Sequence, residues 1–94
     1  MTSSDFLGTG LALQMTRSVV LLRVELDALA DALRTLARAH KSTEMIGRSH
    51  AIHGEPITFG FKVAGWLAET ERNRSRLERL EADVAVGQIS GAMG

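Results

Sequence analysis

The residues best able to do chemistry lie together in one short stretch, GRSHAIHGEP, at positions 47–56. The stretch contains two histidines, His50 and His53, and the acidic residue Glu55 follows closely. An imidazole titrates near neutral pH, so histidine is the side chain best suited to general acid–base catalysis. The stretch is therefore the first candidate for a functional site.

Two other interpretations compete with acid–base catalysis here. His50, His53 and Glu55 carry metal-ligand chemistry, but an HxxH pair outside a helix, without a further well-spaced ligand, is weak evidence for a metal site. We therefore expect no bound metal. Histidines that only form hydrogen bonds within a connector are the usual structural alternative, and the motifs elsewhere in the chain must decide between that role and catalysis.

A second candidate lies at the start of the chain, where residues 2–5 read TSSD. Ser3 or Ser4 is expected to cap a helix, and Asp5 suits the positive end of the helix dipole. Hydroxyl groups beside the free N–H groups of a helix start also form a ready site for a carboxylate or a phosphate. The capping role and the ligand-binding role are compatible, and both require a helix to follow.

A long helix is predicted after TSSD. Its apolar residues recur at alternating steps of four and three, which is the pattern of a helix packed lengthwise against others. This seam comprises Met15, Val19, Leu22, Leu26, Leu29, Leu33 and Leu36. A second apolar edge lies beside the seam, so one partner helix cannot cover the whole surface. We predict a helix from about residue 4 to about residue 40, roughly 55 Å long at 1.5 Å per residue.

Residues 41–55 are predicted to be a loop, because polar residues interrupt the apolar pattern there and two glycines and Pro56 punctuate the second part of the segment. A second helix is expected from about residue 56 to about residue 87, with Pro56 in its first turn. Its apolar face comprises Phe59, Val63, Trp66, Leu67, Leu77, Leu80 and Val84. The final residues, GQISGAMG, form a Gly-rich tail.

The arginines of the second helix have ordinary structural interpretations. Arg74 lies near the apolar stripe, where a stem packed on apolar groups with its head in water is preferred to a buried ion pair or a ligand contact. Arg72, Arg76 and Arg79 fall on the opposite face, but they alternate with glutamates, which is typical of a solvated surface. We therefore expect no nucleic-acid partner.

The composition supports one small folded domain. The chain has 94 residues, 45% of them hydrophobic, and a formal net charge of zero. No cysteine is present, which excludes disulfides and thiolate zinc sites. The longest apolar run, SVVLL, is too short to span a bilayer. We expect a soluble, cytoplasmic protein with no membrane partner.

The predicted fold is all-α, with two long antiparallel helices that form an αα-hairpin joined by the histidine-containing loop. Two such helices make a poor core, because each leaves an apolar flank in water, which small soluble monomers rarely tolerate. The chain is therefore expected either to form a larger bundle with copies of itself or to be a piece of a larger protein.

The segments that carry chemistry resemble, in the same order and at similar spacing, adenylosuccinate lyase of the fumarase and aspartase superfamily. These segments are TSSD, TEMIGRSHAIHGEPITFGFK, AETERN and VGQISGAMG, and they cover nearly the whole chain. The combination of TSSD with EPxTFG is similar to the adenylosuccinate branch more than to fumarase, aspartase or argininosuccinate lyase. The resemblance implies that residues 1–94 are a part of the superfamily's central helical bundle.

The resemblance also implies an activity, a β-elimination that releases fumarate. The substrates would be adenylosuccinate, which gives AMP, and the succinyl-carboxamide intermediate of purine synthesis, and no cofactor is implied. His50 matches the family's general acid, while Thr2 and Ser3 match the pair that holds a substrate carboxylate. Ser49 stands where the family usually has threonine and keeps the hydroxyl group. His53 matches a common companion, to which we assign a supporting role.

The chain departs from the family pattern in ways that matter unequally. Ala51 and Gly54 exchange the more usual glycine and alanine around His53, and Gly8 and Gly10 replace bulkier or acidic residues. Nothing here matches the mobile signature loop that supplies the family's base, nor the N-terminal domain or the last helices. We therefore expect a central fragment that is inactive alone.

The family builds each active site from several subunits, so the resemblance implies a homo-oligomer, and a tetramer for the full-length enzyme. The alternative from another class is a catalytically dead helical oligomerisation module that has kept the bundle helices and lost the chemistry. This module would have the same fold and the same assembly, and the 94 residues do not separate it from the lyase.

Overall fold

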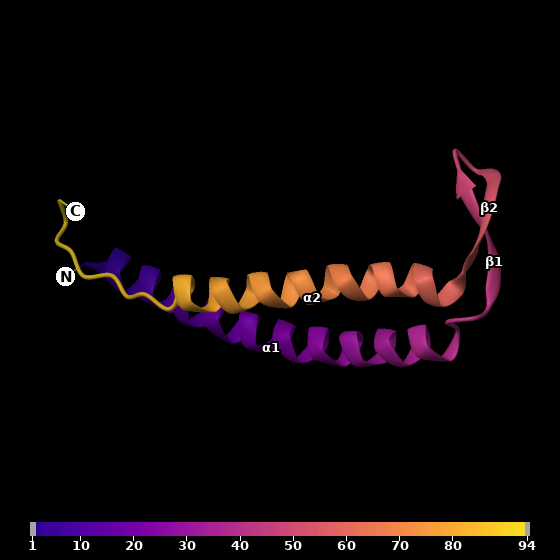
Figure 1. Ribbon diagram of the computed structural model, residues 1–94. Coiled ribbons are helices and arrows are strands. Elements are labelled where there is room, and N and C mark those ends of the chain that lie inside the picture. Colours follow the sequence, from indigo (N-terminus) through magenta and orange to yellow (C-terminus); the bar gives the residue numbers. More distant parts are fainter. Residues whose placement is uncertain (1, 94) are drawn as a thin grey trace.

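The computed structural model describes residues 2–93, which form two helices joined by a two-stranded hairpin (Figure 1). In chain order the elements are α1 (Ser3–Ala39), β1 (Glu44–Ser49), β2 (Ile52–Thr58) and α2 (Phe59–Val84). The helices run antiparallel side by side, and the hairpin stands across their direction at the end where α1 finishes and α2 begins. The molecule measures 64 × 28 × 14 Å, so it is an elongated rod.

The predicted pair of long antiparallel helices is confirmed, but the predicted loop is wrong over most of its length. Residues 44–58 form the antiparallel hairpin of β1 and β2, in which Met45 pairs with Ile57 and Ser49 pairs with Ile52. Pro56 lies in β2 opposite Ile46 and not in a helical turn. A proline is tolerated there because both strands of a two-stranded sheet are edge strands.

The second helix therefore begins three residues later than expected, at Phe59, and it ends at Val84 instead of near residue 87. Its start is fixed by Thr58, whose hydroxyl accepts a hydrogen bond from the Phe61 N–H at 3.1 Å. This is the ordinary N-cap arrangement, in which a side-chain oxygen satisfies one of the unpaired N–H groups of the first turn. Threonine at the cap thus marks the boundary more accurately than the proline before it.

The two helices approach most closely where the connector joins them. Gly60 is buried, and a Cβ atom at this position would lie 2.6 Å from both the Ala37 carbonyl oxygen and the Lys41 Cα. The Gly60 N–H donates to the His40 carbonyl oxygen at 2.9 Å, and the Phe59 N–H donates to the Thr43 carbonyl oxygen at 2.8 Å. The start of α2 is thereby fastened to the end of α1 through backbone contact.

Along the rest of the rod the buried positions are few and small. On α1 the buried apolar residues are Ala12, Val19 and Ala30, and on α2 the fully buried apolar side chain is that of Val63. More than half of the predicted seam is left outside the interface, and its exposed members are Met15, Leu22, Leu29 and Leu36. The expectation that one partner helix cannot cover the apolar surface of α1 is thus confirmed.

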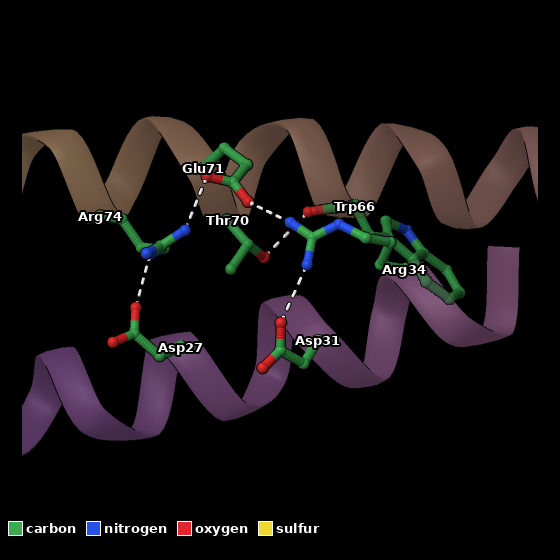
Figure 2. A network of polar contacts seen from close by, with 7 residues as sticks. All are labelled: Asp27, Asp31, Arg34, Trp66, Thr70, Glu71 and Arg74. Carbon is green, nitrogen blue, oxygen red and sulfur yellow. Dashed lines mark hydrogen bonds and ion pairs between the residues drawn. The ribbon is translucent and has the colours of Figure 1, made fainter.

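A network of charged side chains joins the middle of the two helices (Figure 2). Arg74 on α2 donates from Nε to Asp27 on α1 at 2.7 Å and from Nη1 to Glu71 at 2.9 Å. Arg34 on α1 contacts the other oxygen of Glu71 at 3.0 Å and also Asp31 at 2.9 Å. The ion pairs of Arg74 are partly exposed, so they are not the buried ion pair that the sequence analysis set against a head in water; the guanidinium group nevertheless has carboxylate partners on both helices.

Within residues 2–93, neither helix combines the length and the apolar character that crossing a membrane would require.

Candidate functional site

His50 occupies the tip of the hairpin, in the two-residue turn between β1 and β2. The turn residues His50 and Ala51 have φ values of 51° and 64°, which lie in the left-handed region and fit a type I′ hairpin turn. Arg48 Nη1 donates to the Ala51 carbonyl oxygen at 3.4 Å. Both His50 and its neighbour Ser49 are exposed. The predicted general acid and the predicted hydroxyl partner therefore project together into solvent.

A register shift in the hairpin sets the direction of its tip. Ile46 pairs with Pro56 while Arg48 pairs with His53, so β2 carries one more residue than β1 between these pairs. Gly47 stands opposite this bulge, where a Cβ atom would lie 2.8 Å from the Glu55 carbonyl oxygen. Bulges strengthen the local twist of a hairpin and commonly aim side chains near functional sites.

The other predicted site residues lie at the start of α1. Thr2 is the N-cap, with an extended backbone, so the expectation that Ser3 or Ser4 caps the helix is wrong. The Thr2 N–H donates to Asp5 Oδ2 at 2.7 Å, and the Asp5 N–H donates to the Thr2 carbonyl oxygen at 3.1 Å. Ser3 is the first helical residue and is exposed. A hydroxyl group, the helix N-terminus and solvent access therefore coincide there, as binding of a carboxylate requires.

One copy of the chain does not bring these two groups of residues together. Thr2 and Ser3 lie at one end of the 64 Å rod, and the hairpin that carries Ser49 and His50 stands at the other end (Figure 1). A helix the length of α1 spans roughly 55 Å at 1.5 Å per residue, far more than a small molecule can bridge. The structure therefore presents two separate half-sites and no complete one.

The two remaining histidines have different surroundings. His53 lies on β2 opposite Arg48 and is exposed. His40, which sequence reasoning did not single out, ends α1, and its Nδ1 lies 3.0 Å from the Thr43 hydroxyl. Its ring also meets Phe59 edge-on at 5.3 Å between centroids. His40 therefore shapes the connector between α1 and the hairpin.

No group of three or more histidine, cysteine, aspartate or glutamate side chains with metal-binding geometry is found within residues 2–93. An open groove of about 440 Å³ lies between the hairpin and the first turns of α2, with Arg48, Phe61 and Lys62 among the residues that line it. It adds positive charge and an aromatic face on the hairpin side of the molecule.

Sequence reasoning also missed a contact between the two ends of the chain. After α2, the tail returns along the start of α1, where the Ser90 N–H and the Ser90 hydroxyl each donate to Asp5 Oδ1 at 3.0 Å. The Gln88 N–H donates to the Thr9 hydroxyl at 3.0 Å. The TSSD motif and the Gly-rich tail therefore lie together, although they are at opposite ends of the sequence.

Comparison with known proteins adds to this geometry. A family model described as "Lyase" matches residues 1–94, so the chain belongs to this lyase family. Among curated proteins, the adenylosuccinate lyase of Synechocystis sp. is 57% identical over 94 residues, which is all of this chain and 22% of that protein. The adenylosuccinate lyase of Thermotoga maritima is 44% identical over the same share of both chains. The resemblance stated from the motifs is thus confirmed.

Two solved structures share the fold. The fumarate lyase from Mesorhizobium sp. BNC1 superposes with a TM-score of 0.95 at 39% identity, covering 99% of this chain and 22% of that one. The 3-carboxy-cis,cis-muconate lactonizing enzyme from Pseudomonas putida gives 0.93 at 40% identity, covering 97% and 21%. The chain thus spans about a fifth of the length of the relatives it matches.

Proposed function

We propose that the chain is a central segment of a lyase that eliminates fumarate from adenylosuccinate to give AMP. The same enzyme would act on the succinyl-carboxamide intermediate of purine synthesis. The observation that carries this proposal is the 57% identity to an adenylosuccinate lyase over all 94 residues, including both half-sites. The fold is also shared with a fumarate lyase at a TM-score of 0.95.

The proposed reaction sets three demands on the protein. A base removes a proton from the carbon beside a carboxylate, donors stabilise the charge that develops on that carboxylate, and an acid protonates the departing nitrogen. The C–N bond breaks as the new C=C bond of fumarate forms, and the bonding pair of electrons leaves with nitrogen. The base lies outside these 94 residues in this proposal.

His50 is proposed as the general acid that delivers the proton to nitrogen. Its exposure at the hairpin tip supports this role, because the ring can meet a ligand held by other parts of the enzyme. Its left-handed backbone conformation also supports the role, since strained backbone is retained most often where a side chain must be aimed. Ser49 would place a hydroxyl group beside the same ligand.

Thr2 and Ser3 are proposed to hold a carboxylate of the substrate. The start of α1 offers their hydroxyl groups together with the positive end of a 37-residue helix. Anions bind readily at such positions because backbone N–H groups point toward them and the helix dipole favours negative charge. This arrangement would also stabilise charge as it builds on the carboxylate during elimination.

The separation of the half-sites supports a homo-oligomer, because one copy does not bring them together. We propose that this oligomer is a tetramer and that the enzyme is cytoplasmic. Two rods packed antiparallel would place the helix start of one copy near the hairpin tip of another. The exposed apolar residues along α1, including Leu22 and Leu29, would be covered in such a bundle. The isolated segment is accordingly proposed to be inactive.

The test uses a chimeric lyase, in which residues 1–94 replace the matching part of the Synechocystis adenylosuccinate lyase. The chimera should release fumarate from adenylosuccinate, and the isolated segment should not. His50→Ala should lower kcat roughly 100-fold or more, because positioned general acids contribute on this scale. Release of fumarate is followed by absorbance.

The matched control is His53→Ala, which removes the other exposed imidazole of the hairpin and should have a much smaller effect on kcat. Undiminished turnover of the His50→Ala chimera would show that this ring is not the acid. A chimera that folds and assembles but releases no fumarate would contradict the proposed reaction and would favour the catalytically dead helical module.

A second candidate reaction follows from the 40% identity to the lactonizing enzyme, which is close to the identity of several adenylosuccinate lyases. The same chimera is therefore also assayed with 3-carboxy-cis,cis-muconate. Conversion of that compound in place of adenylosuccinate would favour the lactonizing reaction.

A further inference from the structure

Asp5 is the one charged residue that is buried among residues 2–93, with only 2% of its surface exposed. Its carboxylate accepts three hydrogen bonds, one at Oδ2 from the Thr2 N–H and two at Oδ1 from the N–H and the hydroxyl of Ser90. Thr2 and Ser90 are 88 positions apart in the sequence. A single buried carboxylate therefore joins the N-cap of α1 to the returning tail.

A second contact lies one turn further along α1, where the Gln88 N–H donates to the Thr9 hydroxyl. The end of the Gln88 side chain lies over Gly8. The Gln88 side chain is flexible and can rotate away from position 8, so only the backbone contact from Gln88 to Thr9 fixes the tail at this turn. We call the Asp5–Ser90 and Thr9–Gln88 contacts the tail clasp.

We propose that Asp5 is a positioning residue, which acts through the tail clasp to hold the N-cap and first turn of α1 in the orientation that presents Thr2 and Ser3 to the substrate. This inference rests on the proposed function, because it assumes that these hydroxyl groups bind a carboxylate. Asp5 itself points away from solvent and toward the tail, so it acts on the substrate only through its neighbours.

The first turn of a long helix needs such support. The N–H groups at a helix start have no partner within the helix, and helix ends fray unless side chains or tertiary contacts restrain them. The Asp5 carboxylate restrains both the residue before the helix, Thr2, and the chain that packs on the turn, at Ser90. Loss of this carboxylate would free both at once.

The buried carboxylate of Asp5 needs these donors, because an ionised group that is removed from water without hydrogen bonds costs free energy. The hydrogen bond from the Thr2 N–H lowers the pKa of the Asp5 carboxyl below its ordinary value of 3.8, against the opposing effect of burial, and the Ser90 donors add to the lowering. The carboxylate is therefore held ionised at neutral pH, and the clasp weakens only as the pH falls through the lowered pKa.

The test compares Asp5→Asn, Ser90→Ala and Ser90→Thr in the chimeric lyase. Asp5→Asn keeps the size of the side chain but removes the charge, and it should raise KM about tenfold or more while kcat changes much less, because substrate binding loses its oriented hydroxyl groups. Ser90→Ala should raise KM by a smaller factor. Ser90→Thr keeps the hydroxyl group and should have the KM of the unsubstituted chimera. Once Asp5 is replaced, Ser90→Ala should add little.

The matched control is Asp31→Asn, which removes an aspartate of the same helix from an exposed ion pair with Arg34. It should leave KM unchanged. An equal rise of KM in this control, an unchanged KM in both clasp variants, or a fall in kcat equal to the rise in KM would overturn the proposal.

Amide hydrogen exchange separates this inference from the proposed function, since it needs no substrate. In Asp5→Asn the hydrogen-bonded amides of Thr2, Asp5, Gln88 and Ser90 should exchange faster, while those in the middle of α2 should keep the rate of the unsubstituted chimera. Unchanged exchange at both ends would overturn the clasp even in an active enzyme. Faster exchange in a chimera that releases no fumarate would support the inference about the clasp and would contradict the proposed reaction.

Discussion

The turn at the hairpin tip places two residues with side chains in a backbone conformation that favours glycine. Left-handed backbone costs an ordinary L-residue about 1 kcal/mol, and both His50 and Ala51 adopt it. For His50 the proposed catalytic role accounts for the residue. Ala51 is exposed, so burial of its methyl group does not offset the cost.

The first prediction at this scale is that Ala51→Gly stabilises the hairpin. Glycine adopts the observed φ of 64° without strain, although it also makes the unfolded chain more flexible. The net free energy of local unfolding of the hairpin should rise by about 0.5–1 kcal/mol. Amide exchange across β1 and β2 in the chimeric lyase measures this difference. Faster exchange in the variant would contradict the strain argument.

The control substitution has the opposite expected sign. Ala28→Gly introduces glycine into the middle of α1, where the backbone is already helical, and it should destabilise the helix by about 1 kcal/mol. The contrast separates the effect of the left-handed turn from a general effect of glycine.

Residue types at the half-sites could be predicted from the sequence, because hydroxyl, imidazole and carboxylate groups stand out in an apolar chain. Their partners could not. The choice of Thr2 over Ser3 as the cap depends on where the helix turns begin, and all three residues 2–4 are good caps. The bond from Ser90 to Asp5 depends on the path of the tail, for which the sequence holds no periodic signal.

Among the elements, the helices were predictable and the hairpin was not. An apolar period near 3.5 over more than twenty residues is a strong helical signal, and α1 begins and ends within one residue of the expected limits. The strands lack the alternation that reveals a sheet with one buried face, because most residues of β1 and β2 are exposed. Their glycines and proline then favoured a loop.

The prediction at this scale concerns the contact between α1 and α2 at Gly60. Gly60→Ala should destabilise the helix pair by about 1–3 kcal/mol, because the added methyl group would meet backbone atoms of Ala37 and Lys41 that cannot rotate away. Thermal unfolding of the chimeric lyase measures the loss. A variant as stable as the unsubstituted protein would show that the helices can separate at this point without cost.

The matched control is Gly65→Ala, on the same helix. A Cβ atom at this position would have no atom outside the local backbone within 4 Å, so the substitution should be neutral or stabilising by up to about 1 kcal/mol, because alanine is the better helix former. The same Gly→Ala change should thus destabilise the protein at position 60 but not at position 65.

At the scale of the whole molecule, the distance between the half-sites predicts complementation between variants. His50→Ala damages one end of the rod and Ser3→Ala damages the other, and each chimeric variant alone should be nearly inactive. Copies of the two variants that are dissociated, mixed and reassembled should regain roughly a quarter of the unsubstituted activity, because some sites then combine two intact ends from different copies.

The control for this experiment carries both substitutions in one chain and is mixed with either single variant. That mixture should regain no activity, since every site lacks an intact end of one kind. Failure of the two single variants to complement each other after mixing would show that the two ends of the rod do not contribute to one shared active site.

The sequence predicted that further helices must cover α1, but it did not predict which helices these are. Leu22, Leu29 and their neighbours along the seam signal that other helices must cover α1. Their spacing does not specify whether those helices come from the same chain or from another copy, because both would bury the same stripe.

The length of α1 has a consequence for how such a protein can diverge. Inserting one residue into the middle of the helix would rotate everything beyond it by about 100° and advance it by about 1.5 Å. The start of α1 would then face a different direction from the hairpin at the far end, even though every original side chain remained. Evolution can therefore exchange residues along this rod far more readily than it can add or delete them.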